Sequence, residues 1–281
     1  MVNFNGTLLN NDANFLNNAN RGLRYGDSLF EAIRVVNGRI YFLEEHYLRL
    51  MSSMRIVRME IPMEFTMEFL ESEILKTLAA NKGNNAHRVR FTVFRNDGGL
   101  YLPKTNSISY CIEVKELINP FYTISETPYE VELFKDFYVN KDMLSNLKTN
   151  NRMLNVVGSV FAKENDFQNC LLINGDKMVV EALNGNVFLV SGEMIKTPPL
   201  KDGCLDGILR KKIIEILKKS TVYNIKEESI SPFELQKADE IFITNTINGI
   251  IPVYKYRKKI FENTTSKDLI GKLNALARLI A

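Results

Sequence analysis

The chain has 281 residues, of which 45% are hydrophobic and 25% are charged, a composition typical of a soluble globular protein with one or two domains. No apolar run is long enough to span a membrane, and the first residues lack the basic and apolar regions of a secretory signal, so we expect a cytoplasmic protein. The net charge of +3 is spread over segments that also carry Glu, which argues against a nucleic-acid partner.

The cysteines and histidines argue against a disulfide framework and against a metal site. The three cysteines, Cys111, Cys170 and Cys204, are widely spaced, odd in number and without a C-x-x-C pair, unlike a disulfide scaffold or a structural zinc site. The two histidines, His46 and His87, are too few for a typical histidine-rich metal site. We therefore expect small molecules, or further copies of this chain, as partners.

The first half of the chain predicts short strands and two amphipathic helices, ending in a linker. In chain order we expect a strand over 38–43, helices from about 44 to 58 and from about 64 to 80, and strands over 88–95 and 110–117. Apolar residues recur at helical spacing in both helices: Leu43, Tyr47, Leu50 and Met54, then Met67, Leu70, Ile74 and Leu78. Residues 118–128, with Pro120 and Pro128, are the expected linker, so residues 1–117 form a small N-terminal domain.

The second half, residues 129–281, predicts a larger C-terminal domain. In chain order we expect a strand over 131–139, β-rich stretches over 169–174, 178–190 and 193–197, a helix over 205–219, a strand over 240–246 and a helix near 266–280. The pattern Thr265-x-x-Asp268 predicts the cap of the last helix. Strands and helices occur in groups, without a single alternating βαβ array, so we expect an α+β architecture of two domains.

One lysine, Lys148, lies in the polar run that precedes the apolar-periodic residues Leu154, Val157 and Phe161. A lysine that acts as a nucleophile or base near neutral pH needs burial or a neighbouring cation to lower its pKa. Local sequence alone favours an ordinary solvated lysine. The reason to suspect chemistry at Lys148 comes from the rest of the chain.

Five ordered segments carry a resemblance to a known family. They are "NRGLRYGDSLFEAIRVVNGRIYFLEEHYLRL" (20–50), "NLKTNNRMLNVVG" (146–158), "MVVEALNGNVFLV" (178–190), "KTPPLKDGCLDGILR" (196–210) and "ADEIFITNTINGIIPV" (238–253). Their order and intervals resemble the class IV aminotransferases, which are fold-type IV pyridoxal 5′-phosphate (PLP) enzymes. That group includes branched-chain and D-amino-acid aminotransferases and 4-amino-4-deoxychorismate lyase. The resemblance covers about residues 20–255 and implies PLP as cofactor and a homodimer whose active sites lie near the interface.

The resemblance implies two catalytic residues. "LKTNNR" is similar to the segment that holds the Schiff-base lysine, so Lys148 would bond to C4′ of PLP and then shuttle the proton between Cα and C4′. Glu181 matches the carboxylate that keeps the pyridine nitrogen protonated, so that the ring accepts electrons from Cα. The alternative for Glu181 is an exposed strand glutamate. Its apolar neighbours Val179 and Val180 favour a buried charge that requires a partner.

The resemblance also assigns residues to the phosphate: Arg49, then Gly207, Ile208 and Leu209 at a helix start, then Asn245 and Thr246. A guanidinium can bind phosphate through two parallel hydrogen bonds, although Arg49 could equally be solvated at the edge of a helix face. Free backbone N–H groups at a helix N-terminus favour an anion. Leu209 stands where the family often has threonine, which removes one hydroxyl donor and leaves the amide. The alternative for Thr246 is that it merely ends a strand.

Substrate recognition is assigned to four residues by the resemblance: Tyr25 and Phe30 as aromatic walls, and Arg90 and Arg95 as candidate carboxylate ligands. Both aromatic residues could equally belong to the core. Period-2 alternation puts Arg90 and Arg95 on opposite faces of one strand unless the strand bulges, so at most one of them binds substrate. We prefer Arg95, because an arginine on the otherwise apolar face requires an anion nearby.

Two reactions therefore remain in competition. We favour transamination between an amino acid and a 2-oxo acid. "NNR", "NDGGLY" and the missing threonine favour 4-amino-4-deoxychorismate lyase, which would release pyruvate and 4-aminobenzoate, whereas "ADEIFITNT" and "IIPV" favour the aminotransferases. A protein that kept the fold and lost PLP is a third alternative, and the joint presence of Lys148, Glu181, Arg49 and Thr246 argues against it.

Overall fold

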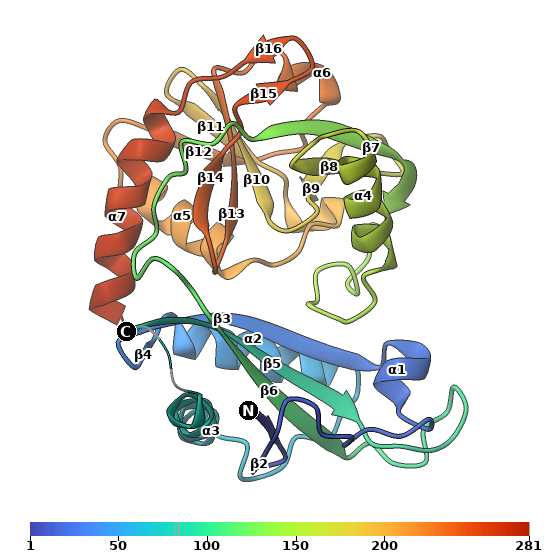
Figure 1. Ribbon diagram of the computed structural model, residues 1–281. Helices are drawn as coiled ribbons and strands as arrows, with labels where there is room; N and C mark the ends of the chain where they lie inside the picture. Colours follow the sequence, from blue (N-terminus) through green and yellow to red (C-terminus); the bar gives the residue numbers. More distant parts are fainter. Residues whose placement is uncertain (82, 84, 281) are drawn as a thin grey trace. The chain divides into compact units, whose positions relative to one another are not determined.

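The computed structural model describes residues 1–81, 83 and 85–280, and the chain folds into two compact units (Figure 1). Unit 1 contains Met1–Pro120, Lys148–Asn151 and Ala277–Ala281, and unit 2 contains Phe121–Leu147 and Arg152–Leu276. The expected C-terminal domain carried Lys148, whereas the structure groups this residue with unit 1. The reason is local pairing, because the amide of Phe30 donates to the carbonyl of Lys148 at 2.9 Å.

Unit 1 contains, within the described residues, a six-stranded sheet in the order β2-β1-β6-β5-β3-β4. Its elements are β1 (Val2–Phe4), β2 (Thr7–Leu9), α1 (Arg21–Tyr25), β3 (Ser28–Val36), β4 (Arg39–Ile40), α2 (Leu43–Ile56), α3 (Met67–Ala80), β5 (Ala86–Arg95) and β6 (Ile108–Glu116). The strand expected over 38–43 is shorter, because Phe42 adopts the left-handed conformation (φ 58°) and α2 begins at the next residue.

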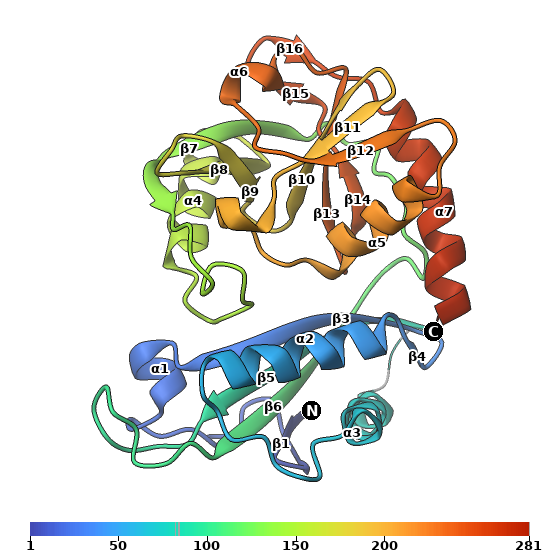
Figure 2. The ribbon, with the colours of Figure 1, turned by 180° about the vertical axis from the view of Figure 1, so that it is seen from behind.

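The two faces of this sheet differ in what covers them. α2 lies along β3 (Figure 2). On the β5 face that carries Phe91, the Phe91 ring centroid lies 6.0 Å from that of Phe65, which in turn lies 5.3 Å from that of Phe69 on α3, so this face is covered by helices. β5 pairs continuously with β3 and β6 from His87 to Phe94. Alternation along β5 therefore holds, and its other face carries Arg90.

Unit 2 contains, in the described part of the chain, two five-stranded sheets, in the orders β12-β11-β10-β13-β14 and β16-β15-β7-β8-β9. Its elements are β7 (Glu130–Val139), α4 (Met153–Glu164), β8 (Asn169–Asn174), β9 (Val179–Ala182), β10 (Asn186–Ser191), β11 (Met194–Thr197), η1 (Leu200–Asp202), α5 (Ile208–Lys218), β12 (Asn224–Glu227), α6 (Pro232–Leu235), β13 (Glu240–Asn245), β14 (Gly249–Pro252), β15 (Lys255–Tyr256), β16 (Lys259–Ile260) and α7 (Thr264–Ile280). The observed elements confirm the mixed α+β prediction.

The β-rich stretch predicted over 178–190 consists of two strands, β9 and β10. They are joined by a turn in which a Cβ on Gly185 would lie 2.4 Å from the carbonyl oxygen of Thr244. One local prediction in unit 2 requires correction: the predicted Thr265-x-x-Asp268 cap is wrong. The carboxylate of Glu240 accepts the amides of Thr265 and Ser266, each at 2.8 Å, so a buried strand residue satisfies the start of α7.

Within the described ranges no helix has both the length and the apolar character that a membrane crossing requires. The same residues contain no group of three or more His, Cys, Asp or Glu placed to hold a metal ion. Cys111, Cys170 and Cys204 are buried and free.

Candidate functional site

Lys148 is held against the start of β3 in unit 1. The amide of Asn150 donates to the carbonyl of Ser28 at 3.0 Å, and Thr149 forms a β-bridge with Leu29. The Nζ atom of Lys148 lies 4.6 Å from the ring centroid of Phe30, within the range of a cation–π contact. The half-buried lysine is thus fixed at its backbone and close to an aromatic face, unlike a lysine on a free loop.

A buried cluster of Glu31, His46 and Arg49 lies in the same unit. Arg49 Nε donates to Glu31 Oε1 at 2.8 Å, Arg49 Nη2 contacts Glu31 Oε2, and His46 Nδ1 lies 2.7 Å from Glu31 Oε2. Burial by itself would raise the pKa of Glu31, but Arg49 and His46 lower that pKa to about 2. Arg49, the expected phosphate ligand, therefore pairs two N–H groups with a carboxylate that is ionised at neutral pH.

His46 completes this cluster as a neutral residue. Burial lowers its pKa, and the charges of Arg49 and Lys148 lower it further, against the opposing effect of Glu31. A neutral imidazole that donates Nδ1–H to Glu31 has an acceptor at Nε2, and this buried Nε2 has no partner among the described residues. Sequence reasoning missed Glu31 and His46. The sequence pattern that could have indicated them is a glutamate within an apolar strand, followed by a helix that carries His46 and Arg49 three residues apart.

Arg90 lies on the open face of the unit 1 sheet. Its Cζ is 3.8 Å from the ring centroid of Phe30, Nη2 donates to Asn150 Oδ1 at 2.8 Å, Nε donates to Thr92 Oγ1 at 3.2 Å, and Glu113 Oε2 is 3.9 Å from Nε. Because its side chain is still 28% exposed, Arg90 is both fixed in position and open to a ligand.

Arg95 lies on the helix-covered face and has a different role. Its Nε donates to Asp27 at 3.0 Å, Nη2 to the carbonyl of Val57 at 2.7 Å, and Nη1 to the carbonyl of Arg58 at 3.0 Å and to Asn106 Oδ1 at 2.5 Å. The anion that the apolar face required is Asp27, within the same unit. Arg95 therefore has its anion within unit 1, whereas Arg90 keeps a partly exposed side chain.

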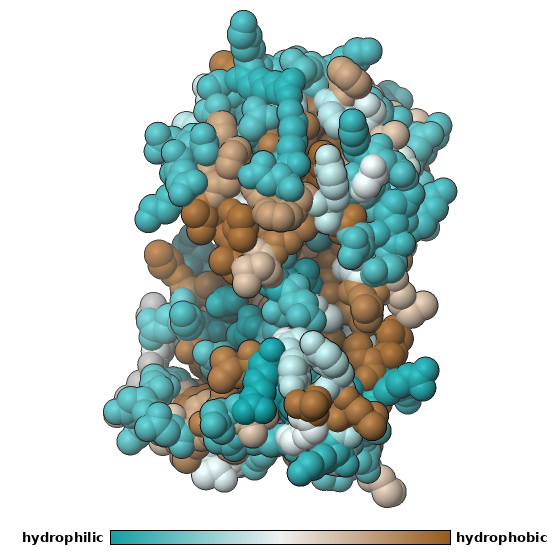
Figure 3. Space-filling view, turned by 90° about the vertical axis from the view of Figure 1, so that its right-hand side faces the viewer, coloured by the Kyte–Doolittle hydropathy of each residue, from teal (hydrophilic) through white to brown (hydrophobic). Residues whose placement is uncertain are grey.

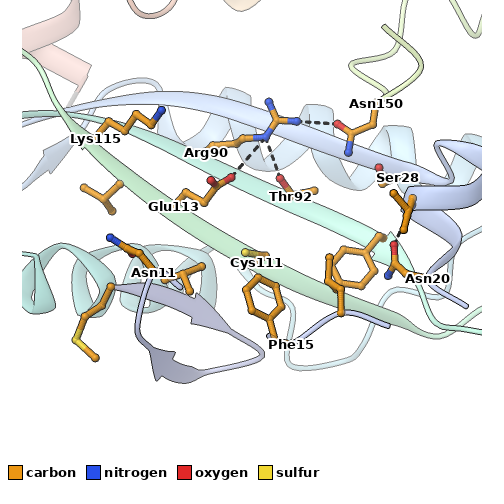
Figure 4. A pocket seen from close by; sticks show the side chains of 17 residues that line it. Asn11, Phe15, Asn20, Ser28, Arg90, Thr92, Cys111, Glu113, Lys115 and Asn150 are labelled. Atoms are coloured by element: carbon orange, nitrogen blue, oxygen red, sulfur yellow. Dashed lines mark hydrogen bonds and ion pairs between the residues drawn. The ribbon is translucent and has the colours of Figure 1, made fainter. Parts of the chain in front are cut away.

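A cavity of about 610 Å³ opens beside Arg90 in unit 1. Figure 4 shows Arg90 reaching Asn150, Thr92 and Glu113 at one wall of the cavity. The remaining lining is largely apolar and includes Phe15, Leu23, Phe94 and Cys111. The Oγ atom of Ser28 also belongs to the lining, and it is buried without a partner in the described part of the chain. An apolar floor with a few converging polar groups is typical of a small-molecule site.

Glu181 occupies a buried position on β9 in unit 2. Glu181 is 6% exposed. Its Oε2 accepts a hydrogen bond from the amide of Leu205 at 2.8 Å, and Asn186 Nδ2 donates to the carbonyl of the same Leu205 at 2.8 Å. The structure thus excludes the alternative of an exposed strand glutamate. Glu181 instead joins β9 to the segment that precedes α5.

Helix α5 begins directly after the segment that contains Leu205. Gly207 is its N-cap, and in the described structure no side chain caps this end and no acidic residue lies in its first turn. The amide of Gly207 donates to the carbonyl of Leu205 at 2.9 Å, so the first-turn amides begin at Ile208. A Cβ on Gly207 would lie 2.0 Å from Asn186 Oδ1, so a larger residue here would displace the side chain of Asn186. The side chain of Leu209 is buried.

The end of β13 places further polar groups in unit 2. Asn245 Oδ1 accepts the amides of Ile247 and Asn248 at 3.1 and 2.9 Å, and Tyr122 Oη donates to the carbonyl of Thr246 at 2.9 Å. Asn245 therefore builds the turn that carries Thr246. The preceding Thr244 has a buried Oγ1 with no partner among the described residues.

Each unit by itself carries groups of the kinds that an anionic, hydrogen-bonding cofactor such as PLP requires. Unit 1 has a fixed lysine and a buried acceptor at His46 Nε2. Unit 2 has a buried carboxylate at Glu181 and, at α5, a helix N-terminus suited to a phosphate. The buried hydroxyl of Thr244 belongs to unit 2 as well.

The family model described as "Amino-transferase class IV" matches residues 28–256. The chain therefore belongs to the class IV aminotransferase family, whose members are PLP-dependent enzymes. It has the fold-type IV architecture.

Three known proteins illustrate the range of this family. The chain is 28% identical, over 90% of its length and 86% of the relative, to a "Putative branched-chain-amino-acid aminotransferase" of Methanocaldococcus jannaschii. It is 27% identical, over 89% of its length and 86% of the relative, to a D-alanine aminotransferase of Bacillus licheniformis. The solved structure of 4-amino-4-deoxychorismate lyase from Pseudomonas aeruginosa superimposes with a TM-score of 0.82 at 22% identity, over 97% of each chain. The fold is thus common to aminotransferases and a lyase and does not separate the two reactions.

Proposed function

We propose that this chain binds PLP through Lys148 and transfers an amino group between an amino acid and a 2-oxo acid. The observation that carries the proposal is the environment of Lys148 in unit 1. Its backbone is paired with β3, its Nζ lies 4.6 Å from the Phe30 ring centroid, and its charge acts on the buried His46. A lysine whose backbone is fixed and whose Nζ lies beside an aromatic ring is held in one place, which suits an amine that must meet the aldehyde carbon of PLP.

When bound, PLP would supply an aldehyde carbon that reacts with amines and a ring that accepts electrons from the substrate Cα. Lys148 Nζ would take the proton from Cα and return it. The carboxylate of Glu181 would hold a proton on the pyridine nitrogen. The amides of Ile208 and Leu209, the turn at Asn245 and Thr246, and the positive charge of Arg49 would hold the phosphate. A guanidinium has five N–H donors, so Arg49 can bind phosphate while it remains paired with Glu31.

Arg90 is the proposed ligand of the substrate carboxylate. Its guanidinium is oriented by Phe30, Thr92 and Asn150 before any substrate binds, and such preorganisation lowers the entropic cost of binding. Tyr25 and Phe30 are half-buried and would form aromatic walls. Arg95 would then stabilise unit 1 and would not bind the substrate.

The lyase is the second candidate, and one contact favours keeping it. Asn150, which belongs to the "NNR" motif that points to the lyase branch, accepts a hydrogen bond from Arg90 at 2.8 Å. The motif is thus part of the proposed substrate site. Both reactions require removal of the same α-proton and differ in what leaves afterwards.

The test combines a spectrum with an activity assay. Purified protein supplied with PLP should show a visible absorption band that borohydride removes, and Lys148→Ala should lose the band, whereas Lys163→Ala, at an exposed lysine on α4, should keep it. Amino-group transfer that requires a 2-oxo acid supports the aminotransferase. Pyruvate and 4-aminobenzoate formed from 4-amino-4-deoxychorismate without a 2-oxo acid would replace it with the lyase. A band that survives Lys148→Ala contradicts the lysine assignment.

The homodimer and the cytoplasmic location also belong to this proposal. On α4, Met153, Val156 and Val160 lie at helical spacing and are 74%, 56% and 52% exposed, and apolar side chains reach the surface on the side of the molecule where α4 lies (Figure 3). Such an apolar stripe on a surface helix suits a contact between subunits. Val156→Glu should shift sedimentation toward the monomer, while Lys218→Glu, at an exposed lysine on α5, should not. The reduced, buried cysteines are those expected in a reducing compartment.

A further inference from the structure

Arg21, the first residue of α1, is a buried arginine whose hydrogen bonds all reach other segments of unit 1. Its side chain is 4% exposed. Nε donates to Asp27 Oδ2 at 2.8 Å, Nη1 donates to the carbonyls of Gly98 and Leu100 at 3.0 and 2.6 Å, and Nη2 donates to the carbonyl of Tyr101 at 3.1 Å. A buried guanidinium is costly unless its donors are satisfied. Here three of its four acceptors are carbonyls of one loop, residues 96–106.

The same loop is also held at its far end. Asp27 Oδ2 accepts a hydrogen bond from Arg95 Nε at 3.0 Å, and Arg95 Nη1 donates to Asn106 Oδ1 at 2.5 Å. Asp27 therefore links two buried arginines, of which Arg21 holds the loop tip and Arg95 holds the loop end. This arrangement fixes the loop at its tip and at its C-terminal end.

The backbone of the loop fits this fixed form. Gly99 has φ +77°, and a Cβ there would lie 2.1 Å from the carbonyl oxygen of Leu102. The bend thus needs glycine, and it turns the carbonyls of Gly98, Leu100 and Tyr101 toward the buried arginine. The opposite side of the same bend carries side chains outward.

Those side chains are large and apolar. Leu100, Tyr101 and Leu102 are 76%, 88% and 84% exposed. The ring of Tyr101 lies 5.7 Å from that of Tyr25, centroid to centroid, and the Cζ atom of Arg21 lies 5.0 Å from the Tyr25 centroid. One buried arginine therefore contacts both the loop backbone and Tyr25, the proposed aromatic wall of the substrate site.

We infer that Arg21 is a positioning residue that fixes the Tyr25–Tyr101 pair as a rigid apolar wall for the substrate side chain. Arg21 acts through these two rings and through loop 96–106. The loop is then a fixed arm instead of a mobile lid, and the substrate class it suits is an amino acid or 2-oxo acid with an apolar side chain. The substrate role rests on the proposed function, whereas the restraint on the loop does not.

The test compares Arg21→Lys with Arg24→Lys. Lysine keeps the charge at position 21 and loses the planar fork that reaches several carbonyls at once, while Arg24 is an exposed residue on the same helix. Chymotrypsin should cleave native Arg21→Lys enzyme at residues 100–102 about tenfold faster than wild type, because cleavage follows local opening. The KM for an amino acid with an apolar side chain should rise about tenfold while kcat stays within about twofold, the pattern of lost binding without lost chemistry. The PLP absorption band should not change. Arg24→Lys should match wild type in all three measurements.

A second variant, Tyr101→Ala, removes the presented ring without touching the buried arginine, and it should raise the same KM to a similar extent. Unchanged cleavage in Arg21→Lys, or an unchanged KM in Tyr101→Ala, would overturn the inference. If Arg21→Lys fails to fold, the KM of Tyr101→Ala decides. A wild-type enzyme inactive on amino acids would overturn the proposed function and with it the substrate role, while the cleavage comparison would still decide whether Arg21 holds the loop.

Discussion

Arg49 Nε lies 2.8 Å from Glu31 Oε1, and both side chains are almost fully buried, at 8% and 2% exposure. A buried ion pair of this kind adds little to the free energy of unfolding compared with an apolar pair of similar volume. Removing one partner, however, leaves an uncompensated charge in a region of low dielectric and destabilises the fold. In unit 1 this pair joins strand β3 to helix α2, so its loss affects both stability and the position of a proposed phosphate ligand.

Glu31→Gln should lower the free energy of unfolding by about 3 kcal/mol, because it leaves Arg49 buried without its counter-charge. Urea unfolding of the two proteins at pH 7 measures the difference. Glu44→Gln, at an exposed residue in the first turn of α2, is the matched control and should change stability by less than about 0.5 kcal/mol. Equal effects of the two substitutions would show that the buried pair does not stabilise the fold.

The same carboxylate predicts how stability depends on pH. Folding lowers the pKa of Glu31 from 4.5 to about 2, so its stabilising contribution is present above pH 4.5 and is lost as the pH falls toward 2. At about 1.4 kcal/mol per pKa unit, this contribution is on the order of 3 kcal/mol. Folding also lowers the pKa of His46 from 6.5, so stability begins to fall as the pH drops below that value. Urea unfolding at a series of pH values should show both steps.

In Glu31→Gln the step between pH 4.5 and 2 should shrink, because the group that takes up the proton is gone. Other carboxylates still titrate in this range, so the informative quantity is the difference between the two curves. Curves that run parallel below pH 4.5 would contradict the low pKa of Glu31.

Local periodicity was sufficient to predict most elements, and it also placed Arg90 and Arg95 on opposite faces of β5. It could not reveal which face the helices cover, because that depends on packing between segments far apart in the chain. The preference for Arg95 assumed that its anion would be a substrate. The anion is Asp27, and the contact joins residues 68 positions apart, beyond the reach of any local pattern.

The buried cluster shows the same limit. The resemblance singled out Arg49, but Glu31 and His46 gain their roles only because β3 packs against α2. Similarly, Lys148 lies 118 residues after its neighbour Phe30 in the chain, and only the pairing of Lys148–Asn151 with β3 brings them together. Motifs thus named the candidate residues of the site, while the contacts of these residues depend on tertiary packing.

Arg90 and Arg95 should respond to lysine substitution in opposite ways. Arg90→Lys should raise the KM for the substrate by about tenfold, because lysine cannot bind a carboxylate through a planar fork, and it should leave stability within about 0.5 kcal/mol. Arg95→Lys should lower the free energy of unfolding by about 2 kcal/mol, since buried hydrogen bonds to Val57 and Asn106 are lost. Steady-state kinetics and urea unfolding of both variants check this. A KM effect confined to Arg95→Lys would restore Arg95 as the substrate ligand.

The start of α7 offers a test of how this helix is capped. Glu240 accepts the amides of Thr265 and Ser266, and Ser266 Oγ also donates to it, so both carboxylate oxygens are used. In Glu240→Gln one of these oxygens becomes an NH₂ group that faces a backbone donor. Because a buried donor without an acceptor costs about 1–3 kcal/mol, the free energy of unfolding should fall by that amount.

Burial raises the pKa of Glu240, so the folded state binds its proton more readily than the unfolded chain does, and the contribution of Glu240 to stability grows as the pH falls. Glutamine does not titrate, so the loss in Glu240→Gln should not shrink as the pH is lowered from 7. Asp268 belongs to the sequence pattern for the cap but forms an exposed ion pair with Lys272. Asp268→Asn should therefore cost less than about 0.5 kcal/mol. Hydrogen exchange at the amides of Thr265 and Ser266 gives a second readout, which should accelerate in Glu240→Gln alone. A larger effect of Asp268→Asn on both measurements would show that Asp268, and not Glu240, caps α7.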